Sequence, residues 1–164
     1  MPIEALKAKI EKAKAQKKSY KKLFKKLSTL PTKQVDRLFH TNHEKAFENI
    51  DCLDCANCCK TTSPIFRDID INRISSKLKM KPGTFIERYL ILDDEGDYVL
   101  QSSPCTFLAS DNKCSIYEFR PQACREYPHT NRKSMTQILN LTYKNTFMCP
   151  AVAEIVETIK KEIQ

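Results

Sequence analysis

The sequence Cys52-Leu53-Asp54-Cys55-Ala56-Asn57-Cys58-Cys59 holds four of the chain's eight cysteines. A C-x2-C loop turns tightly enough for two thiolates to bind one metal, and C-x2-C-x2-C lets three thiolates converge. Cys58 and Cys59 are adjacent, so we expect them to serve different sites, or one of them to be a spare or supporting group. This run predicts a metal-binding protein organised around its cysteines.

The other four cysteines follow at wide intervals: Cys105, Cys114, Cys124 and Cys149. Structural zinc sites usually use two C-x2-C knuckles, and this chain has only one. A C-x2-C-x2-C run completed by a remote cysteine before a proline is a bacterial iron–sulfur arrangement, and Cys149-Pro150 supplies that cysteine. One partition assigns Cys52, Cys55, Cys58 and Cys149 to a cluster of the 4Fe-4S kind, and Cys59, Cys105, Cys114 and Cys124 to a second metal. Zn²⁺ stays open as the alternative to an iron–sulfur cluster.

Disulfides are the competing explanation for so many cysteines. The N-terminus has no apolar stretch of the length that an export signal needs, and no run of about 20 apolar residues could span a membrane. We therefore expect a cytoplasmic protein, in a compartment where clustered thiols bind metals more often than they pair. A chain of 164 residues can also bury a core without covalent staples.

Basic side chains flank the later cysteines. Arg120 and Arg125 are expected to compensate the charge of clustered thiolates; ordinary surface ion pairs or phosphate contacts are the alternative. His129 follows Cys124 closely enough to support the site. For His40 and His43, three residues apart on an expected helix, packing or solvation is the better interpretation than metal ligation.

Residues 1–27 hold ten lysines and two glutamates, while the remaining residues balance to neutrality within a net charge of +8. Apolar residues recur there at spacings of three and four, interrupted at Lys17, which predicts a long basic amphipathic helix. We expect residues 1–30 to form a basic helical arm and residues 31–164 the cysteine domain. The arm could bind nucleic acid, a membrane surface or an acidic protein, or its lysines could simply be a solvated face.

The remaining elements are predicted from the spacing of apolar residues and from the positions of proline, capping and turn residues. Helices are expected over residues 32–50, 69–78, 85–90, 121–125 and 150–163, with Asp68 and Thr84 as N-caps. Strands are expected over residues 98–100 and 137–147, a polar turn over 93–97, and a hairpin or knuckle between Cys105 and Tyr117. With only two glycines in the chain, these elements indicate a mainly helical α+β fold.

The strings CLDCANCCK, PCTFLASDNKCSIYEFRPQACREYP and FMCP resemble the YkgJ-type cysteine-cluster family of zinc- or iron-chelating domains, over residues 51–150. The resemblance implies metal chelation and assigns no reaction. A similar cysteine cluster occurs in flagellin lysine methylases, which suggests an enzymatic or iron–sulfur role by analogy only.

Three functions therefore compete. The first is a metal-binding module built on the eight cysteines. The second is a redox or methyl-transfer enzyme that uses a cluster and needs a pocket or an open coordination position beside the metal. The third is an RNA-associated zinc protein that binds through its basic arm.

Overall fold

The computed structural model describes residues 1–163 and divides the chain into two compact units. Unit 1 combines Met1–Cys55 with Pro128–Gln164, and unit 2 is Ala56–Tyr127. The chain is 61% helical, and its one described sheet has two strands, which confirms the expected mainly helical α+β class. No helix within residues 1–163 has both the length and the apolar character needed to cross a bilayer. The boundary expected at residue 30 stays a prediction about domain organisation.

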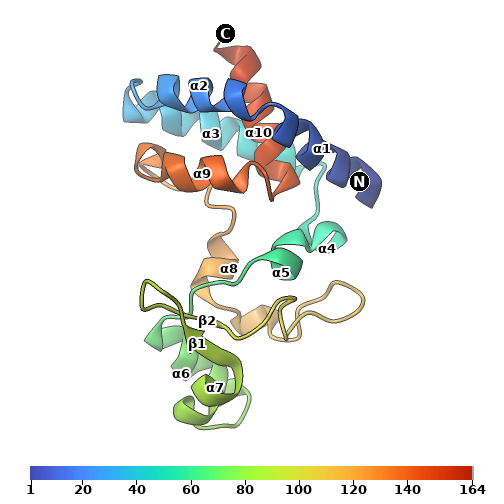
Figure 1. Cartoon of the computed structure of the whole chain (residues 1–164), viewed down its shortest axis with the longest axis vertical. Helices are drawn as coiled ribbons and strands as arrows, with labels where there is room; N and C mark the ends of the chain where they lie inside the picture. Colours follow the sequence, from blue (N-terminus) through green and yellow to red (C-terminus); the bar gives the residue numbers. More distant parts are fainter. Residues whose placement is uncertain (164) are drawn as a thin grey trace. The chain divides into compact units, whose positions relative to one another are not determined.

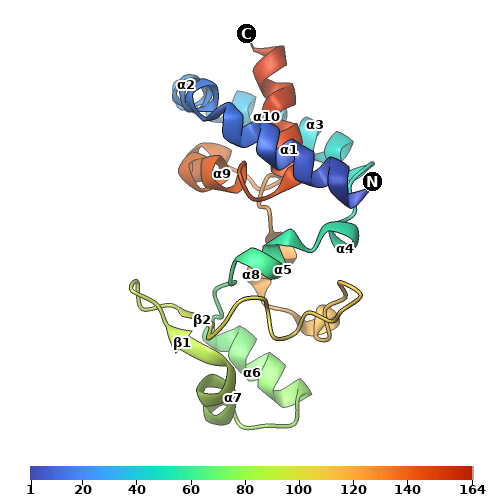
Figure 2. The same cartoon turned by 45° about the vertical axis from the view of Figure 1, so that its right-hand side comes forward.

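Unit 1 is a helical bundle around α10 (Figures 1 and 2). Its helices are α1 (Ile3–Ala15), α2 (Lys17–Leu27), α3 (Thr32–Phe47), α4 (Cys52–Cys55), α9 (Leu139–Asn145) and α10 (Pro150–Glu162), with the 3-10 turn η2 (Met135–Ile138). Helix α10 packs against α1, α2, α3 and α9. It begins at Pro150, as predicted, because proline is tolerated at the first helical position, and it buries an apolar face of Val152, Ile155, Val156 and Ile159.

The single long N-terminal helix is the first correction. The structure has two helices, α1 and α2, which meet at Gln16, where φ is −104° and ψ is 15°. Lys17 interrupts the apolar stripe at this point. The Gln16 side chain also bonds α10, since its Nε2 donates to Glu157 Oε2 at 3.4 Å and its Oε1 accepts from Lys160 Nζ at 2.6 Å. The break lets the stripe resume at Tyr20 in the core of unit 1.

The strand expected over residues 137–147 is also wrong, because this segment forms η2 and α9. Its β-branched content favoured a strand, but threonine can satisfy its hydroxyl inside a helix. Thr142 Oγ1 donates to the Ile138 carbonyl at 3.0 Å, and Thr146 Oγ1 donates to the Thr142 carbonyl at 2.8 Å. Leu139 and the two threonines are buried three to four residues apart, so helical packing against unit 1 outweighs local propensity.

Unit 2 combines short helices with a hairpin. Its elements are α5 (Asn57–Thr61), α6 (Asp68–Lys77), α7 (Pro82–Tyr89), β1 (Leu90–Leu92), β2 (Tyr98–Leu100), η1 (Tyr117–Phe119) and α8 (Gln122–Glu126). Strand β2 was predicted, whereas β1 was not, since Leu90 was expected to continue the preceding helix. The predicted acidic turn joins them: Asp93 Oδ1 accepts the backbone N–H groups of Glu95 and Asp97, both at 2.9 Å, and Gly96 takes a φ of 83°.

Two predicted helix caps are displaced. The N-cap of α6 is Arg67 and not Asp68, and the N-cap of α7 is Lys81 because Pro82 already starts that helix. Unit 2 has its own core, in which the rings of Phe85 and Phe107 stack with centroids 6.3 Å apart. Cys105 and Cys114 pack against this core, which fixes the first two thiols of the candidate site.

Candidate metal centre

The eight cysteines fall into one group in each unit, and all are free thiols. Unit 1 contains Cys52, Cys55 and Cys149, and unit 2 contains Cys58, Cys59, Cys105, Cys114 and Cys124. The structure therefore has none of the disulfides that were the competing explanation.

In unit 2, backbone hydrogen bonds bring distant cysteines to one place. The Cys105 N–H donates to the Cys59 carbonyl at 2.7 Å, which ties the first cysteine run to the second segment. Leu108 then bridges to Cys114, and the Ala109 N–H donates to the Lys113 carbonyl at 2.8 Å, closing the predicted hairpin. This hairpin carries Cys105 and Cys114 on its two arms.

The thiols of this group are close enough to perturb one another. Burial raises the pKa of Cys105 and Cys114, and it raises the pKa of Cys124 to about 12; in each case the charge of Cys59 adds to the rise. The hydrogen bond between Cys58 and Cys59, followed by burial, raises the pKa of Cys59 strongly. Without a cation these groups are neutral thiols, and a divalent metal would reverse that preference.

Cys58 and Cys59 do not face different ways. Their sulfur atoms lie 4.0 Å apart. Two thiolates on one tetrahedral zinc, each about 2.3 Å from the metal, would be about 3.8 Å apart. The separation is compatible with two ligands of one ion, and the expectation that the two cysteines serve different sites, or that one is a spare or supporting group, stays a prediction. Ala56, where φ is 47°, is the N-cap of α5, the helix that carries both residues.

Backbone N–H groups point at several sulfurs. The Cys105 sulfur accepts from the N–H groups of Phe107 and Leu108, and the Cys114 sulfur accepts from Ile116; each bond lowers the thiol pKa against the larger effect of burial. Hydrogen bonds of this kind favour the thiolate, which is the form that binds metal. The hairpin thus supplies two sulfurs together with donors that stabilise their charged form.

Arg120 and Arg125 act differently. The charge of Arg120 lowers the pKa of both Cys114 and Cys124, and its guanidinium lies 3.8 Å from the centre of the Tyr117 ring. Arg125 instead binds backbone, because its Nε donates to the Arg120 carbonyl at 3.2 Å and its Nη2 to the Glu118 carbonyl at 3.1 Å. Arg120 therefore favours thiolates at the site, while Arg125 holds the loop that carries Arg120.

A buried carboxylate that the sequence analysis missed connects α6 to the segment before Cys124. Asp70 is 1% exposed. Its Oδ2 accepts the Arg67 N–H at 3.2 Å, and its Oδ1 accepts Arg73 Nη2 at 2.6 Å and the Gln122 N–H at 3.1 Å. Arg73 also donates to the Arg120 carbonyl at 3.0 Å. Asp70 thus fixes the start of α8, the helix that carries Cys124. Because Arg67 is not one of the residue types that begin a capping box, no local sequence signal marked Asp70.

In unit 1, Cys149 lies immediately before α10, and the N–H groups of Ala151 and Val152 lower its pKa. Burial is the larger effect and raises that pKa to about 12, and the charges of Cys52 and Cys55 add to the rise. Cys55 and Cys149 pack against a small apolar cluster of Leu6, Ile50 and Ala151. Cys52 is exposed. Three of the predicted ligands therefore gather in unit 1.

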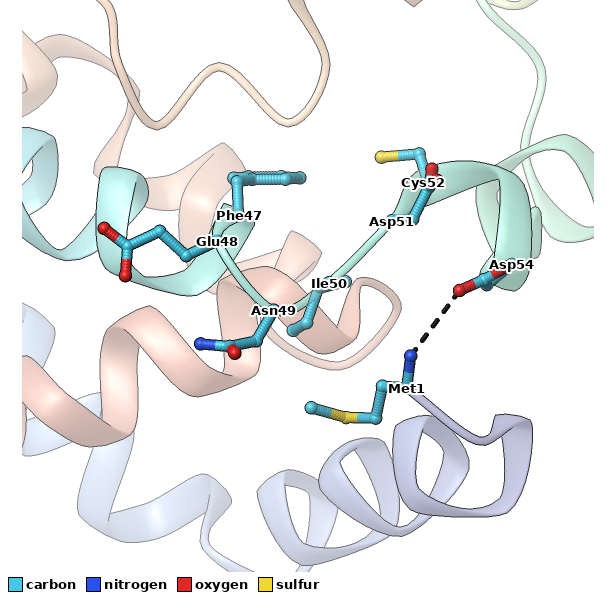
Figure 3. Close-up of a pocket in the computed structure, with 8 residues that line it drawn as sticks. All are labelled: Met1, Phe47, Glu48, Asn49, Ile50, Asp51, Cys52 and Asp54. Carbon is cyan, nitrogen blue, oxygen red and sulfur yellow. Dashed lines mark hydrogen bonds and ion pairs between the residues drawn. The ribbon is translucent and has the colours of Figure 1, made fainter.

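A cavity of about 500 Å³ opens beside Cys52 (Figure 3). It is lined by Met1, Phe47, Glu48, Asn49, Ile50, Asp51, Cys52 and Asp54. The Met1 ammonium lies 3.5 Å from Asp54 Oδ2, and the Cys52 sulfur points toward the side of the cavity where the Phe47 ring lies. The cavity gives solutes access to this thiol.

The three histidines all lie in unit 1. His40 Nε2 is 2.7 Å from the Arg132 carbonyl, and His43 Nδ1 is 2.8 Å from Thr130 Oγ1. Both bonds agree with the packing interpretation of these two residues. His129 is half-buried with a φ of 65°. Its supporting role stays a prediction.

The side chains of the two thiol groups are gathered but are not in the arrangement of a finished metal site. Within residues 1–163, no three His, Cys, Asp or Glu side chains are arranged to hold a metal as they stand. The residues are gathered and their charges interact, but metal loading would require side-chain rearrangement. The donor set itself, thiols with N–H groups and Arg120 nearby, fits a thiophilic cation such as zinc or iron.

The chain belongs to the CxxCxxCC family, whose model matches residues 51–149 and is described as a "Putative zinc- or iron-chelating domain". The match covers more than half of the chain and includes every cysteine. It confirms the resemblance drawn from the cysteine strings, at the level of zinc or iron chelation. No curated protein and no solved structure matches the chain.

Proposed function

We propose that the protein binds metal through two thiol groups, one in each unit. The observation that carries the proposal is that a backbone hydrogen bond holds Cys105 beside Cys59 and that one hairpin carries both Cys105 and Cys114, with Cys124 near enough for their charges to affect its pKa. Four thiolates complete the coordination of one zinc or iron ion. Cys58, 4.0 Å from Cys59, could replace it as a ligand.

The second group is Cys52, Cys55 and Cys149. Three thiolates leave at least one position on a tetrahedral metal for another ligand. Iron is our preferred metal for the protein, as an iron–sulfur cluster, because the sequence has a C-x2-C-x2-C run with a remote Cys-Pro. Cys58, the third cysteine of that run, lies in unit 2, so a cluster in unit 1 would have three cysteine ligands, Cys52, Cys55 and Cys149. The N–H donors at Cys149, Cys105 and Cys114 support either metal, since both bind thiolate.

Metal content separates these possibilities. Protein purified without oxygen and carrying an iron–sulfur cluster should contain iron and sulfide and absorb broadly near ~400 nm. Colourless protein that carries zinc would overturn the preference for iron but would still support the two proposed thiol sites. Protein that holds no metal and takes up neither Zn²⁺ nor Fe²⁺ would overturn the proposal itself.

Cysteine variants test the division into two groups. In a zinc titration, Cys114→Ser/Cys124→Ser, which leaves three of the five unit 2 thiols, should abolish tight binding in unit 2 and leave the unit 1 site, and Cys149→Ser should do the reverse. Ser110→Ala, an exposed change in the Cys105–Cys114 turn, is the control and should bind like the wild type. Circular dichroism of each variant checks its helical content. If both cysteine variants lose the same binding step, the two groups are not separate sites.

The cavity beside Cys52 favours one second candidate, a redox or methyl-transfer enzyme that uses the unit 1 metal. An enzyme of this class needs a coordination position that a substrate can reach. The Co²⁺-substituted Cys114→Ser/Cys124→Ser variant reports on the unit 1 site, because unit 2 then keeps only three thiols. Its visible spectrum should change when imidazole is added if that position is open, whereas an unchanged spectrum would contradict the enzymatic candidate.

A further inference from the structure

We propose that one face of α2 binds the phosphate backbone of double-helical nucleic acid without sequence preference. The α2 lysine face consists of Lys18, Lys21, Lys22 and Lys25. These positions are spaced i, i+3, i+4 and i+7, so they share one side of the helix, and all four side chains are exposed. This function is separate from metal binding, because α2 lies outside the residues that match the chelating domain.

These four lysines differ from several other lysines of residues 1–27, whose side chains have partners in the structure. Lys9 pairs with Glu154 at 2.8 Å, Lys12 with Glu157 at 3.7 Å and Lys14 with Glu11 at 2.7 Å. Lys26 donates to the Ile163 carbonyl. Among the described residues, no ion pair or hydrogen bond engages the side chains of the α2 lysine face, and the sequence has no acidic residue between Glu11 and Asp36.

A face of one sign is costly to keep. Like charges three and four residues apart destabilise a helix, and the α2 lysine face contains several such pairs. A face that only needs to be solvated can mix both signs and avoid this cost. The uniform positive charge therefore indicates an anionic partner.

The packing of α2 decides which anion fits. A helix that binds a membrane inserts its apolar side, but here Tyr20, Leu23, Phe24 and Leu27 are buried in the core of unit 1. A specific interface with an acidic protein would need apolar or aromatic anchors among the charges, and the α2 lysine face has none. Lysine binds phosphate as a point charge, which suits a polyphosphate backbone.

The same burial excludes base stacking by this helix. Tyr20 and Phe24 are its two aromatic residues, and both face the core, so α2 offers no stacking platform for single-stranded bases. The face also has no Arg, Asn or Gln to make a planar, bidentate contact with a base edge, and its lysines bind phosphate as point charges. Binding through phosphates alone is electrostatic, independent of sequence and strongly dependent on salt.

The test measures binding of the full chain to a random-sequence RNA or DNA duplex as salt is varied. Each neutralised phosphate contributes about −0.9 to the slope of log K against log salt, so changing all four lysines to glutamine should reduce the slope by about three to four. Between about 50 and 200 mM salt, the affinity of the wild type should therefore fall about 100-fold further than the affinity of the variant.

The matched control changes Lys9, Lys12, Lys14 and Lys26 to glutamine, which removes the same formal charge from lysines that have partners. The proposal requires a clearly smaller change of slope in this control. Equal changes in both variants would show that only net charge matters and would overturn it, as would absence of duplex binding. Stronger binding to phosphatidylserine vesicles or polyglutamate than to the duplex would also overturn the assignment. The α2 variant should melt no lower than the wild type, because its like-charge repulsion has been removed.

Discussion

Replacing Asp70 by asparagine tests whether this buried carboxylate holds unit 2 together. The wild-type side chain accepts hydrogen bonds from Arg67, Arg73 and Gln122. Asparagine keeps one oxygen for the Arg73 and Gln122 donors, but its amide NH₂ then faces the Arg67 N–H, so two donors meet. The change also removes the negative charge that pairs with Arg73.

The expected cost follows from burial. A hydrogen bond to a charged group contributes about 1.5–3 kcal/mol, and removing one partner of a fully buried pair costs about 3–5 kcal/mol. Asp70 is 1% exposed but the Arg73 side chain is 32% exposed and can regain water, so the lower range applies. We expect a loss of about 2–3 kcal/mol, which for a chain of this size lowers the melting temperature by about 5–10 °C.

The assay is urea unfolding of metal-free protein, followed by circular dichroism. Asp68→Asn is the matched control, because it replaces the same carboxylate by the same amide at an exposed position two residues away. Asp70→Asn should also weaken zinc binding in unit 2, since the Gln122 N–H that it holds begins the helix of Cys124. If the free energies of unfolding of the two variants differ by less than about 0.5 kcal/mol, the hydrogen bonds of Asp70 do not stabilise this region.

Three further predictions concern charged groups. Tyr20→Phe removes a hydroxyl that donates to Glu157 Oε2 at 2.8 Å and should cost about 1.5 kcal/mol in urea unfolding. Burial raises the pKa of Glu157, but the Tyr20 hydroxyl and nearby lysines outweigh this effect and hold the pKa below its usual value. The stability that Glu157 contributes is therefore present above about pH 4.5 and is lost as pH falls. Tyr20→Phe should make the free energy of unfolding depend less on pH in this acid range. Burial lowers the pKa of His43, so as pH falls this histidine takes up a proton in the unfolded chain before it does so in the folded protein. Stability should therefore fall below about pH 6.5, and thermal melts across pH should show that His43→Gln removes this dependence. Arg120→Gln should slow the reaction of Cys124 with a disulfide reagent, because the guanidinium charge that lowers its thiol pKa is gone; an unchanged rate would contradict this.

Much of the secondary structure was predictable because its signals are local. The period of apolar residues predicts helices over residues 32–50 and 150–163, and the structure has α3 and α10 there. Proline at the start of a periodic run predicted the start of α10, and the run Tyr98-Val99-Leu100 after an acidic turn predicted β2. Each of these depends on residues within a few positions of one another, which is the range over which local sequence acts.

The sequence by itself determined the chemistry of this protein: eight thiols, a C-x2-C-x2-CC run, a basic first segment and the cysteine strings that mark a zinc- or iron-chelating family. Only the tertiary structure decided which thiols share a unit, that Gln16 breaks the first helix, that residues 139–145 are helical and that Asp70 holds the start of α8. Those outcomes depend on side chains distant in sequence, such as Gln16 with Glu157 and Asp70 with Gln122. Burial and hydrogen bonding between distant segments outweigh local propensity, and no local pattern records them.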